Sequence, residues 1–146
     1  MSCPHCGKGG KRRSIDQHRR YFSVIKHAFD HWPEGHDFQP DNAEHLRKWL
    51  QVKAGYRTVQ EIDTSRTDPQ AMKVIEATLR AAMKATGDYA WTVVHGRKLY
   101  VVASRSIAFD KIPHGEFCTL NNMVQEVIEA ETGIKVDDLM KETVAA

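Results

Sequence analysis

The sequence predicts an α+β fold in which about four helices pack on a small antiparallel sheet that contains a β-hairpin. In four long segments, apolar residues recur at helical spacing between capping signals. In residues 89–104, aromatic and β-branched residues follow the alternating pattern of strands on both sides of a glycine turn. Such a combination is typical of the α+β class. In these 146 residues we expect a single α+β domain over residues 14–135, a flexible or metal-ordered basic tail over residues 1–13, and a short acidic tail or helix over residues 136–146.

The first helix is expected over residues 14–32. Its start carries the capping-box pattern Ser14-x-x-Gln17, in which the serine hydroxyl accepts a backbone N–H and the glutamine reaches back. Pro33 ends the helix, because a proline disfavours the helical conformation of the residue before it. The apolar residues at helical spacing, which we expect to face the core, are Phe22, Ile25, Phe29 and Trp32.

Two further helices show signals of the same kind. Asp41-x-x-Glu44 opens the first of them, and Gly55 occupies the position just after its C-terminal end, where glycine commonly ends a helix. Asp68-Pro69 opens the second, with proline at the first helical position, and Gly87 ends it. The residues expected to face the core are Ala43, Leu46, Leu50 and Ala54 in the first helix, and Met72, Ile75, Leu79, Ala82 and Thr86 in the second.

Strands are expected between and after these helices. Residues 56–62 predict a short extended segment, and residues 89–104 predict a hairpin with its turn at His95-Gly96-Arg97. Both faces of the hairpin carry apolar residues. We therefore expect helices on one face and a partner or a further strand on the other, which makes a homodimer plausible.

The C-terminal part of the chain is predicted to be helical and acidic. A long helix is expected over residues 114–132, ended by Gly133, and a short acidic helix around residues 137–142. Residues 116–146 hold 2 Lys+Arg and 7 Asp+Glu, a net charge of −5, whereas residues 1–60 hold 11 and 6, a net charge of +5. This asymmetry favours a polyanion as partner, and solvated helix surfaces that differ in charge are the alternative.

The sequence argues against several classes of protein. No apolar stretch approaches the roughly 18 residues of a membrane span, and the N-terminus has no apolar region of a secretory signal. Three cysteines cannot form a fully paired disulfide framework. A Walker loop, a Gly-x-Gly-x-x-Gly motif and a Gly-x-Ser-x-Gly motif are missing from the sequence. We expect a protein of the reducing cytoplasm, with no membrane association and no motif that supports enzymatic activity.

The pattern Cys3-Pro4-His5-Cys6-Gly7 resembles half of a zinc knuckle. Two cysteines separated by two residues bring both thiolates to one tetrahedral ion through a tight turn. We take Cys3, His5 and Cys6 as candidate zinc ligands. A closed site needs further ligands, from a second chain or from His5, His18, His114 or Cys118. Free thiols in a tail and a redox pair are the alternatives.

A cluster of cations precedes and enters the first helix. The free N–H groups at a helix start favour anions, and phosphate groups of nucleic acid bind to clustered lysines and arginines. Tyr21 adds a surface on which a base can stack. A solvated basic face is the alternative. The candidate nucleic-acid-binding residues are Lys11, Arg12, Arg13, Gln17, His18, Arg19, Arg20 and Arg105.

Six of the eight histidines lie before residue 46. His27 and His31 stand four residues apart, a spacing that can hold a metal ion on a helix. They lack the His-Glu-x-x-His pattern, and Pro33 ends the helix just after them. We interpret them as surface residues.

Three stretches resemble a family of small phage and prophage proteins of unknown function. The family pattern places His-Arg-Lys/Arg-Phe/Tyr-Phe after an Arg/Asn-rich start, as in residues 13–22, and ends that helix in Trp-x-Pro or Trp-Glu-Pro, close to Trp32-Pro33 here. A basic helix with an Ala-Gly-Tyr/Phe ending matches residues 46–56, and an Arg-Ser-Ile-Ala-Phe segment matches residues 105–109, with Glu116-Phe117 after it. The Cys-x-x-Cys start departs from many relatives, which carry an N-terminal strand region there.

Residues 13–19 are also similar to a segment of the lambdoid NinB (Orf) recombination proteins. Members of that family are homodimers that bind single-stranded DNA and the host single-strand-binding protein, and they assist recombinase loading. The resemblance implies an accessory role in phage recombination or replication, with residues 11–20 near the DNA. It implies a host single-strand-binding protein or recombinase as a further partner.

Three hypotheses about function are open at this point. The first is a phage-encoded, non-enzymatic accessory protein that binds nucleic acid, prefers single-stranded DNA and acts in the cytoplasm of the bacterial host cell. The second is a protein–protein interaction module that binds or inhibits a host protein through the acidic residues 116–146. The third is a metal-dependent nuclease, for which no spacing motif is found in the sequence.

Overall fold

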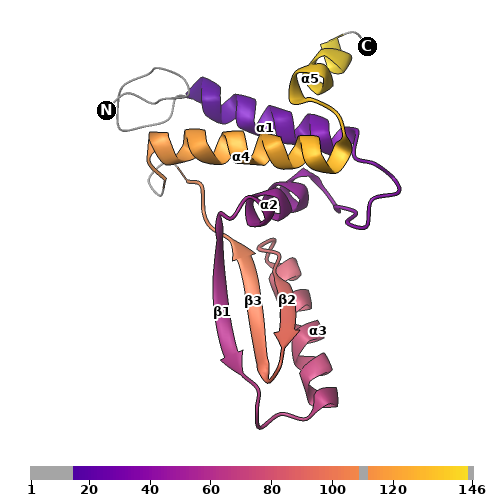
Figure 1. Ribbon diagram of the computed structural model, residues 1–146, viewed down its shortest axis with the longest axis vertical. Coiled ribbons are helices and arrows are strands. Elements are labelled where there is room, and N and C mark those ends of the chain that lie inside the picture. Colours follow the sequence, from indigo (N-terminus) through magenta and orange to yellow (C-terminus); the bar gives the residue numbers. More distant parts are fainter. Residues whose placement is uncertain (1–14, 109–111, 145–146) are drawn as a thin grey trace. The chain divides into compact units, whose positions relative to one another are not determined.

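The computed structural model describes residues 15–108 and 112–144 and divides the chain into two compact units. The helical unit comprises Met1–Ala54 and Ser106–Ala146, and the sheet unit comprises Gly55–Arg105. The described residues form five helices and three strands, which confirms the predicted α+β class (Figure 1). The sequence predicts one domain over residues 14–135, whereas the sheet unit pairs its strands within itself and so forms a separate group of contacts.

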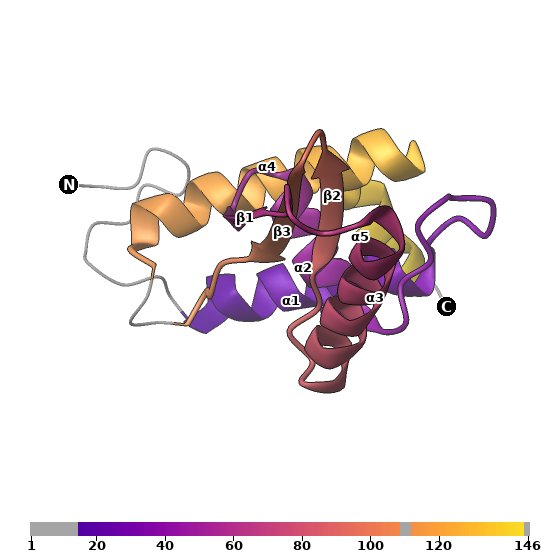
Figure 2. The ribbon, with the colours of Figure 1, turned by 90° about the horizontal axis from the view of Figure 1, so that it is seen from below.

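The helical unit contains α1 (Ile15–Asp30), α2 (Ala43–Lys53), α4 (His114–Thr132) and α5 (Val136–Val144). Helices α1 and α4 lie side by side, with their N-terminal ends at the same end of the unit (Figures 1 and 2). All four helices contribute to one core, because burying apolar side chains is the main favourable contribution to folding. The largest apolar side chains buried there are Tyr21, Ile25, Leu46, Leu50, Phe117, Ile128 and Leu139.

Most of the residues that α1 buries stand one position earlier in the sequence than the residues predicted to face the core. Phe22 and Phe29 are only half-buried, on the flank of the helix. The helix ends at Asp30, so that Trp32 packs from the following loop, where its indole N–H donates to the carbonyl of Phe38 at 2.8 Å. The buried residues of α1 are Tyr21, Val24, Ile25 and Ala28.

The sheet unit contains β1 (Arg57–Asp63), α3 (Pro69–Ala85), β2 (Trp91–His95) and β3 (Lys98–Ser104). The strand order is β1-β3-β2, and both pairings are antiparallel. The predicted hairpin and the predicted extended segment are therefore confirmed. β1 pairs with β3 and widens the sheet, so it is not the further strand expected on the other face of the hairpin. Gly96 has a φ of +63° in the turn, a left-handed conformation that favours glycine.

Helix α3 buries less of its predicted inner stripe than the sequence indicates. Met72 is buried, but Ile75 is 37% exposed and Ala82 is exposed. Within its unit α3 packs against β2, and Glu76 accepts a hydrogen bond from the Thr92 hydroxyl at 2.8 Å. A helix of 17 residues is about 26 Å long, whereas a strand of five residues spans about 17 Å. Part of the stripe therefore extends beyond the strand.

Helix starts follow the sequence signals with one correction. Asn42, rather than Asp41, caps α2, and its side-chain oxygen accepts the backbone N–H of His45 at 2.8 Å. Asn42 has an extended backbone, which places its side chain over the first turn. Asp68 caps α3 as predicted. The predicted cap at Ser14 lies outside the described residues.

A buried polar network connects α1 to α2. Gln51 is fully buried, and its Oε1 atom accepts hydrogen bonds from the Tyr21 hydroxyl at 2.7 Å and from Arg47 Nη1 at 3.0 Å. Arg47 also donates from Nε and Nη2 to the two carboxylate oxygens of Glu44, at 2.9 and 2.7 Å. Each polar group of this chain of contacts thus has a partner, which buried polar groups require.

Glu44→Gln is expected to remove a pH dependence of stability. The hydrogen bond from Arg47 lowers the pKa of Glu44 below its ordinary value of 4.5. A carboxyl whose folded pKa is depressed stabilises the fold above its unfolded pKa and loses that contribution as the pH falls through the folded pKa. Because Glu44 is half-exposed, we expect a loss of only about 0.5 kcal/mol at pH 7. Urea denaturation of both proteins at pH 7 and pH 3 measures it, and an equal pH dependence in the two would contradict the prediction.

Candidate nucleic-acid interface

The predicted nucleic-acid-binding residues fall into three places. Lys11, Arg12 and Arg13 lie outside the described residues, as do the candidate zinc ligands Cys3, His5 and Cys6. Four more, from Gln17 to Arg20, lie in the first two turns of α1. Arg105 belongs to the sheet unit.

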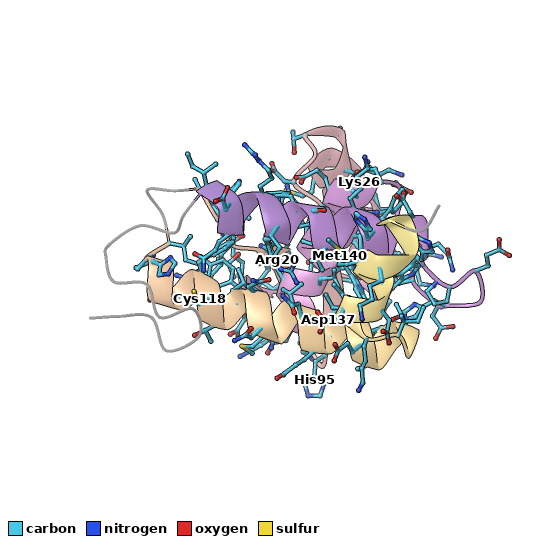
Figure 3. All side chains as sticks on the ribbon, turned by 90° about the horizontal axis from the view of Figure 1, so that it is seen from above. Arg20, Lys26, His95, Cys118, Asp137 and Met140 are labelled. Carbon is cyan, nitrogen blue, oxygen red and sulfur yellow. The ribbon has the colours of Figure 1, made fainter. Side chains whose placement is uncertain are left out.

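Arg19, Arg20 and Lys26 are exposed on α1. Figure 3 shows Arg20 on the side of the helix that faces Asp137 and Lys26 on another side. The side chain of Arg20 is 53% exposed and lies 4.0 Å from the carboxylate of Asp137 on α5. A pair this exposed contributes little to stability, because water screens both charges. Both arginines are therefore accessible to a phosphate group at little cost.

Gln17 and His18 face α4 rather than open solvent. The side-chain amide of Gln17 donates to the Sγ atom of Cys118 at 3.9 Å. The ring of His18 lies 4.7 Å from that of Phe22 and stacks at 6.3 Å on that of Phe117. Both side chains are half-buried. Both side chains therefore pack against α4 near the N-terminal end of α1. Their proposed contact with DNA stays a prediction.

Arg105 is exposed at the end of β3, where its guanidinium lies 5.5 Å from the centre of the Tyr56 ring. Its backbone N–H donates to the carbonyl of Tyr56 at 3.3 Å. A guanidinium over the face of an aromatic ring is a favourable cation–π contact.

One face of the sheet carries aromatic and apolar residues that the sequence did not place together. The register aligns Val59, Val102 and Trp91 across the three strands, and Tyr100 with Val93 in the next row. Helix α3 lies on the opposite face, where the Thr92 hydroxyl reaches it. Val59 is 52% exposed and Val93 is 53% exposed. We call these five residues the open sheet face.

Charges on the same side of the sheet are partly neutralised. Lys98 forms an ion pair with Glu61, and the hydrogen bond to that carboxylate raises the pKa of Lys98 above its ordinary value. The backbone and side-chain hydrogen bonds from Ser65 lower the pKa of Asp63. These hydrogen bonds favour the charged forms of Lys98 and Asp63.

His114 and Cys118 stand four residues apart on the first turns of α4 and are both buried. The Nε2 atom of His114 lies 3.5 Å from the Sγ atom of Cys118. Among the described residues, no group of three or more His, Cys, Asp or Glu side chains is arranged to hold a metal ion. His27 and His31, the other spaced pair, place their Nδ1 atoms 2.7 and 3.0 Å from backbone carbonyls of α1.

A pocket of about 510 Å³ lies in the sheet unit, between the start of α3 and the turn of the hairpin. Lys73 and Glu76 of α3 and Arg97 of the turn contribute its charged groups. Of the predicted nucleic-acid-binding residues that the structure describes, none lines it.

No protein-family model, curated protein or solved structure matches the chain. The resemblance to the phage family and to the NinB proteins therefore stays a prediction from the sequence. In residues 15–108 and 112–144, no helix combines the length and the apolar character that a membrane crossing needs.

Proposed function

We propose that the protein is a phage-encoded, non-enzymatic accessory protein that binds nucleic acid, with a preference for single-stranded DNA, in recombination or replication. It acts in the cytoplasm of the bacterial host cell. The observation that supports this most is the exposure of Arg19 and Arg20 on α1, a few residues after the cationic run Lys11-Arg12-Arg13 in the sequence. The phage origin, and a host single-strand-binding protein or recombinase as further partner, rest on the sequence resemblance.

The chemistry of the α1 start suits a phosphate backbone. Five lysines and arginines fall within residues 11–20, and the single acidic residue among them is Asp16. The positive end of the helix dipole adds to this field, because the first N–H groups of a helix have no partner within the helix. Contacts of this kind bind by releasing counterions, so the affinity depends steeply on salt.

A preference for single strands requires surfaces on which unpaired bases can stack. Trp91 and Tyr100 of the open sheet face are half-buried aromatic side chains of that kind. Tyr56, with Arg105 over its ring, is a third. Aromatic residues on a sheet are a common platform for single-stranded nucleic acid.

Fluorescence anisotropy with a labelled single-stranded oligonucleotide and its duplex tests the proposal. We expect binding to both at low salt, tighter binding to the single strand, and no cleavage of either when Mg²⁺ or Mn²⁺ is added. An absence of binding at low salt would contradict nucleic-acid binding, tighter binding to the duplex would contradict the strand preference, and cleavage would favour the nuclease hypothesis.

A second candidate function, binding to a protein partner, is favoured by the open sheet face. Val59 and Val93 are each about half exposed and lie beside Trp91 and Tyr100 in the sheet. An apolar patch of this kind is typical of a contact surface, for a second copy or for a host protein. Light scattering of the purified protein tests the homodimer, and capture from host lysate after nuclease treatment tests the host partner.

A further inference from the structure

We propose that the pocket of the sheet unit binds a small phosphate monoester that carries hydroxyl groups, the chemical class to which sugar phosphates and nucleotides belong. The pocket has a volume of about 510 Å³ and lies between the start of α3 and the turn of the hairpin. Pockets for small molecules commonly have volumes of about 300–1,000 Å³. Such a ligand would occupy the pocket whether or not DNA binds at the α1 start.

The pocket offers three groups that suit a phosphate. Lys73 of α3 and Arg97 of the hairpin turn are its two cations, and Thr67 adds a hydroxyl group. Among the residues that the structure describes, neither cation forms a salt bridge and the Thr67 hydroxyl has no hydrogen-bond partner. A phosphate monoester carries about 1.5–2 negative charges at pH 7 and accepts hydrogen bonds at three oxygens. Charged donors form the stronger hydrogen bonds to such oxygens.

Two carboxylates close to the pocket in the sequence are already used by the fold, and neither lines it. Asp63 accepts the backbone N–H of Ser65 at 2.9 Å, and Asp68 accepts that of Ala71 at 2.9 Å. The pKa of Asp63 is lowered mainly by its hydrogen bonds with Ser65, and least by the charge of Arg97. The two cations of the pocket therefore remain available to a ligand.

Glu76, the acidic residue of the pocket lining, accounts for the hydroxyl groups of the expected ligand. Its Oε2 atom accepts from the Thr92 hydroxyl at 2.8 Å, and within the described part of the chain its Oε1 atom has no partner. A bare phosphate is repelled by this carboxylate, whereas a hydroxyl group on the same ligand can donate to Oε1. The apolar walls, which suit the carbon part of the ligand, are Pro69, Met72 and Val94.

The pocket is held in shape by the buried residue Thr64. Its backbone N–H and its hydroxyl both donate to the carbonyl of Arg97, at 2.9 and 2.8 Å, and so fix the segment before α3 to the hairpin turn. The carbonyl of Thr64 accepts the backbone N–H of Thr67 at 2.9 Å, which closes the turn that carries the Thr67 hydroxyl. Binding to a preformed site costs less ordering of the chain.

Isothermal titration calorimetry of the full chain with four probes tests the ligand class. We expect ribose 5-phosphate or adenosine monophosphate to bind at millimolar concentration, inorganic phosphate to bind about 10-fold more weakly or less, and ribose not to bind. Tighter binding of one ester would support the proposal and identify the sugar phosphate or the nucleotide as the better ligand. Failure of both esters to bind, or equal binding of ribose, would overturn it.

Three single variants and one double variant locate the bound ester. Lys73→Gln and Arg97→Gln should each weaken its binding about 10-fold or more, because each loses a charged hydrogen bond to the phosphate. Arg80→Gln removes an exposed cation of α3 that does not line the pocket, and should retain the wild-type affinity. The double variant Arg19→Gln, Arg20→Gln should retain it as well, which separates the pocket from the α1 start. Wild-type affinity in Lys73→Gln or Arg97→Gln would overturn the proposal.

Glu76→Gln tests the role of the carboxylate. The glutamine oxygen can still accept from Thr92, but the second carboxylate oxygen is replaced by an amide NH₂ group, which cannot accept. We therefore expect inorganic phosphate to bind more tightly than to the wild type, and the preference for the ester over inorganic phosphate to decrease. An unchanged preference would contradict the contact between Glu76 and the ligand hydroxyl, and with it the proposed ligand class.

Discussion

The double variant Arg19→Glu, Arg20→Glu is expected to bind a single-stranded oligonucleotide on the order of 10–100-fold more weakly than the wild type at low salt. Both side chains are exposed on α1, so their reversal replaces two phosphate contacts by repulsion without disturbing the core. Each phosphate contact to a single strand contributes about 0.7 to the slope of log affinity against log salt. The slope should therefore decrease in magnitude by about 1.4. Anisotropy titrations over a series of salt concentrations measure both quantities.

The matched control for this prediction is Lys73→Glu, Arg80→Glu. Both residues are exposed on α3 of the sheet unit, and the pair of substitutions changes the net charge by the same amount. We expect it to lower the affinity far less, because α3 carries none of the proposed contacts with DNA phosphates and lies on the face of the sheet opposite to the open sheet face. Equal losses in the two double variants would show that overall charge, and not the α1 start, determines binding.

Gln51→Leu is expected to lower the free energy of unfolding of the helical unit by about 2–4 kcal/mol. The amide oxygen of Gln51 accepts from the Tyr21 hydroxyl and from Arg47 within the core. A leucine of similar size leaves a buried hydroxyl without an acceptor and a guanidinium with fewer partners. Urea denaturation followed by the fluorescence of Trp32 and Trp49, both in the helical unit, measures the loss.

A double-mutant cycle with Tyr21→Phe separates the network from simple packing. In the Gln51→Leu background, removing the hydroxyl of Tyr21 should cost nothing or restore part of the stability, because an unsatisfied buried group disappears. Gln70→Leu, at an exposed position of α3, should change stability by less than about 0.5 kcal/mol. Additive losses in the cycle would contradict the role assigned to Gln51.

The local signals of the sequence predict most elements. The helix expected over residues 114–132 is α4, and the glycine expected after it has a φ of +73°. The turn at Gly96 and the strands on both sides of it follow from alternation and from the left-handed conformation that glycine allows. These features depend on residues that are close together in the sequence, so they can be predicted from one sequence.

Features that depend on distant residues could not be predicted. Tyr21 and Phe22 are adjacent aromatic residues, and the choice of Tyr21 for the core depends on the acceptor Gln51, thirty residues further on. Ile75 remains 37% exposed because the sheet beside α3 is narrow, which helical spacing does not report. Sequence spacing thus gives the period of a helix, whereas the partner decides which face is buried.

The candidate site likewise combines features that the sequence predicts with features that depend on distant residues. The exposure of Arg19 and Arg20 agrees with the sequence interpretation, since charged residues at a helix start favour solvent. Gln17 faces Cys118, which lies 101 residues away along the chain, and no local pattern indicates this. Trp91 joins Val59 on the open sheet face only because β3 pairs with both β1 and β2.

Photo-crosslinking of a single-stranded oligonucleotide containing 4-thiothymine tests most directly whether DNA binds at the α1 start. Mass spectrometry of the digested complex locates the crosslinked peptides on the chain. We predict crosslinks within residues 11–26, which hold the cationic run and the exposed basic residues of α1. Crosslinks confined to the sheet unit, or none at a concentration at which the oligonucleotide is bound, would contradict the proposed interface.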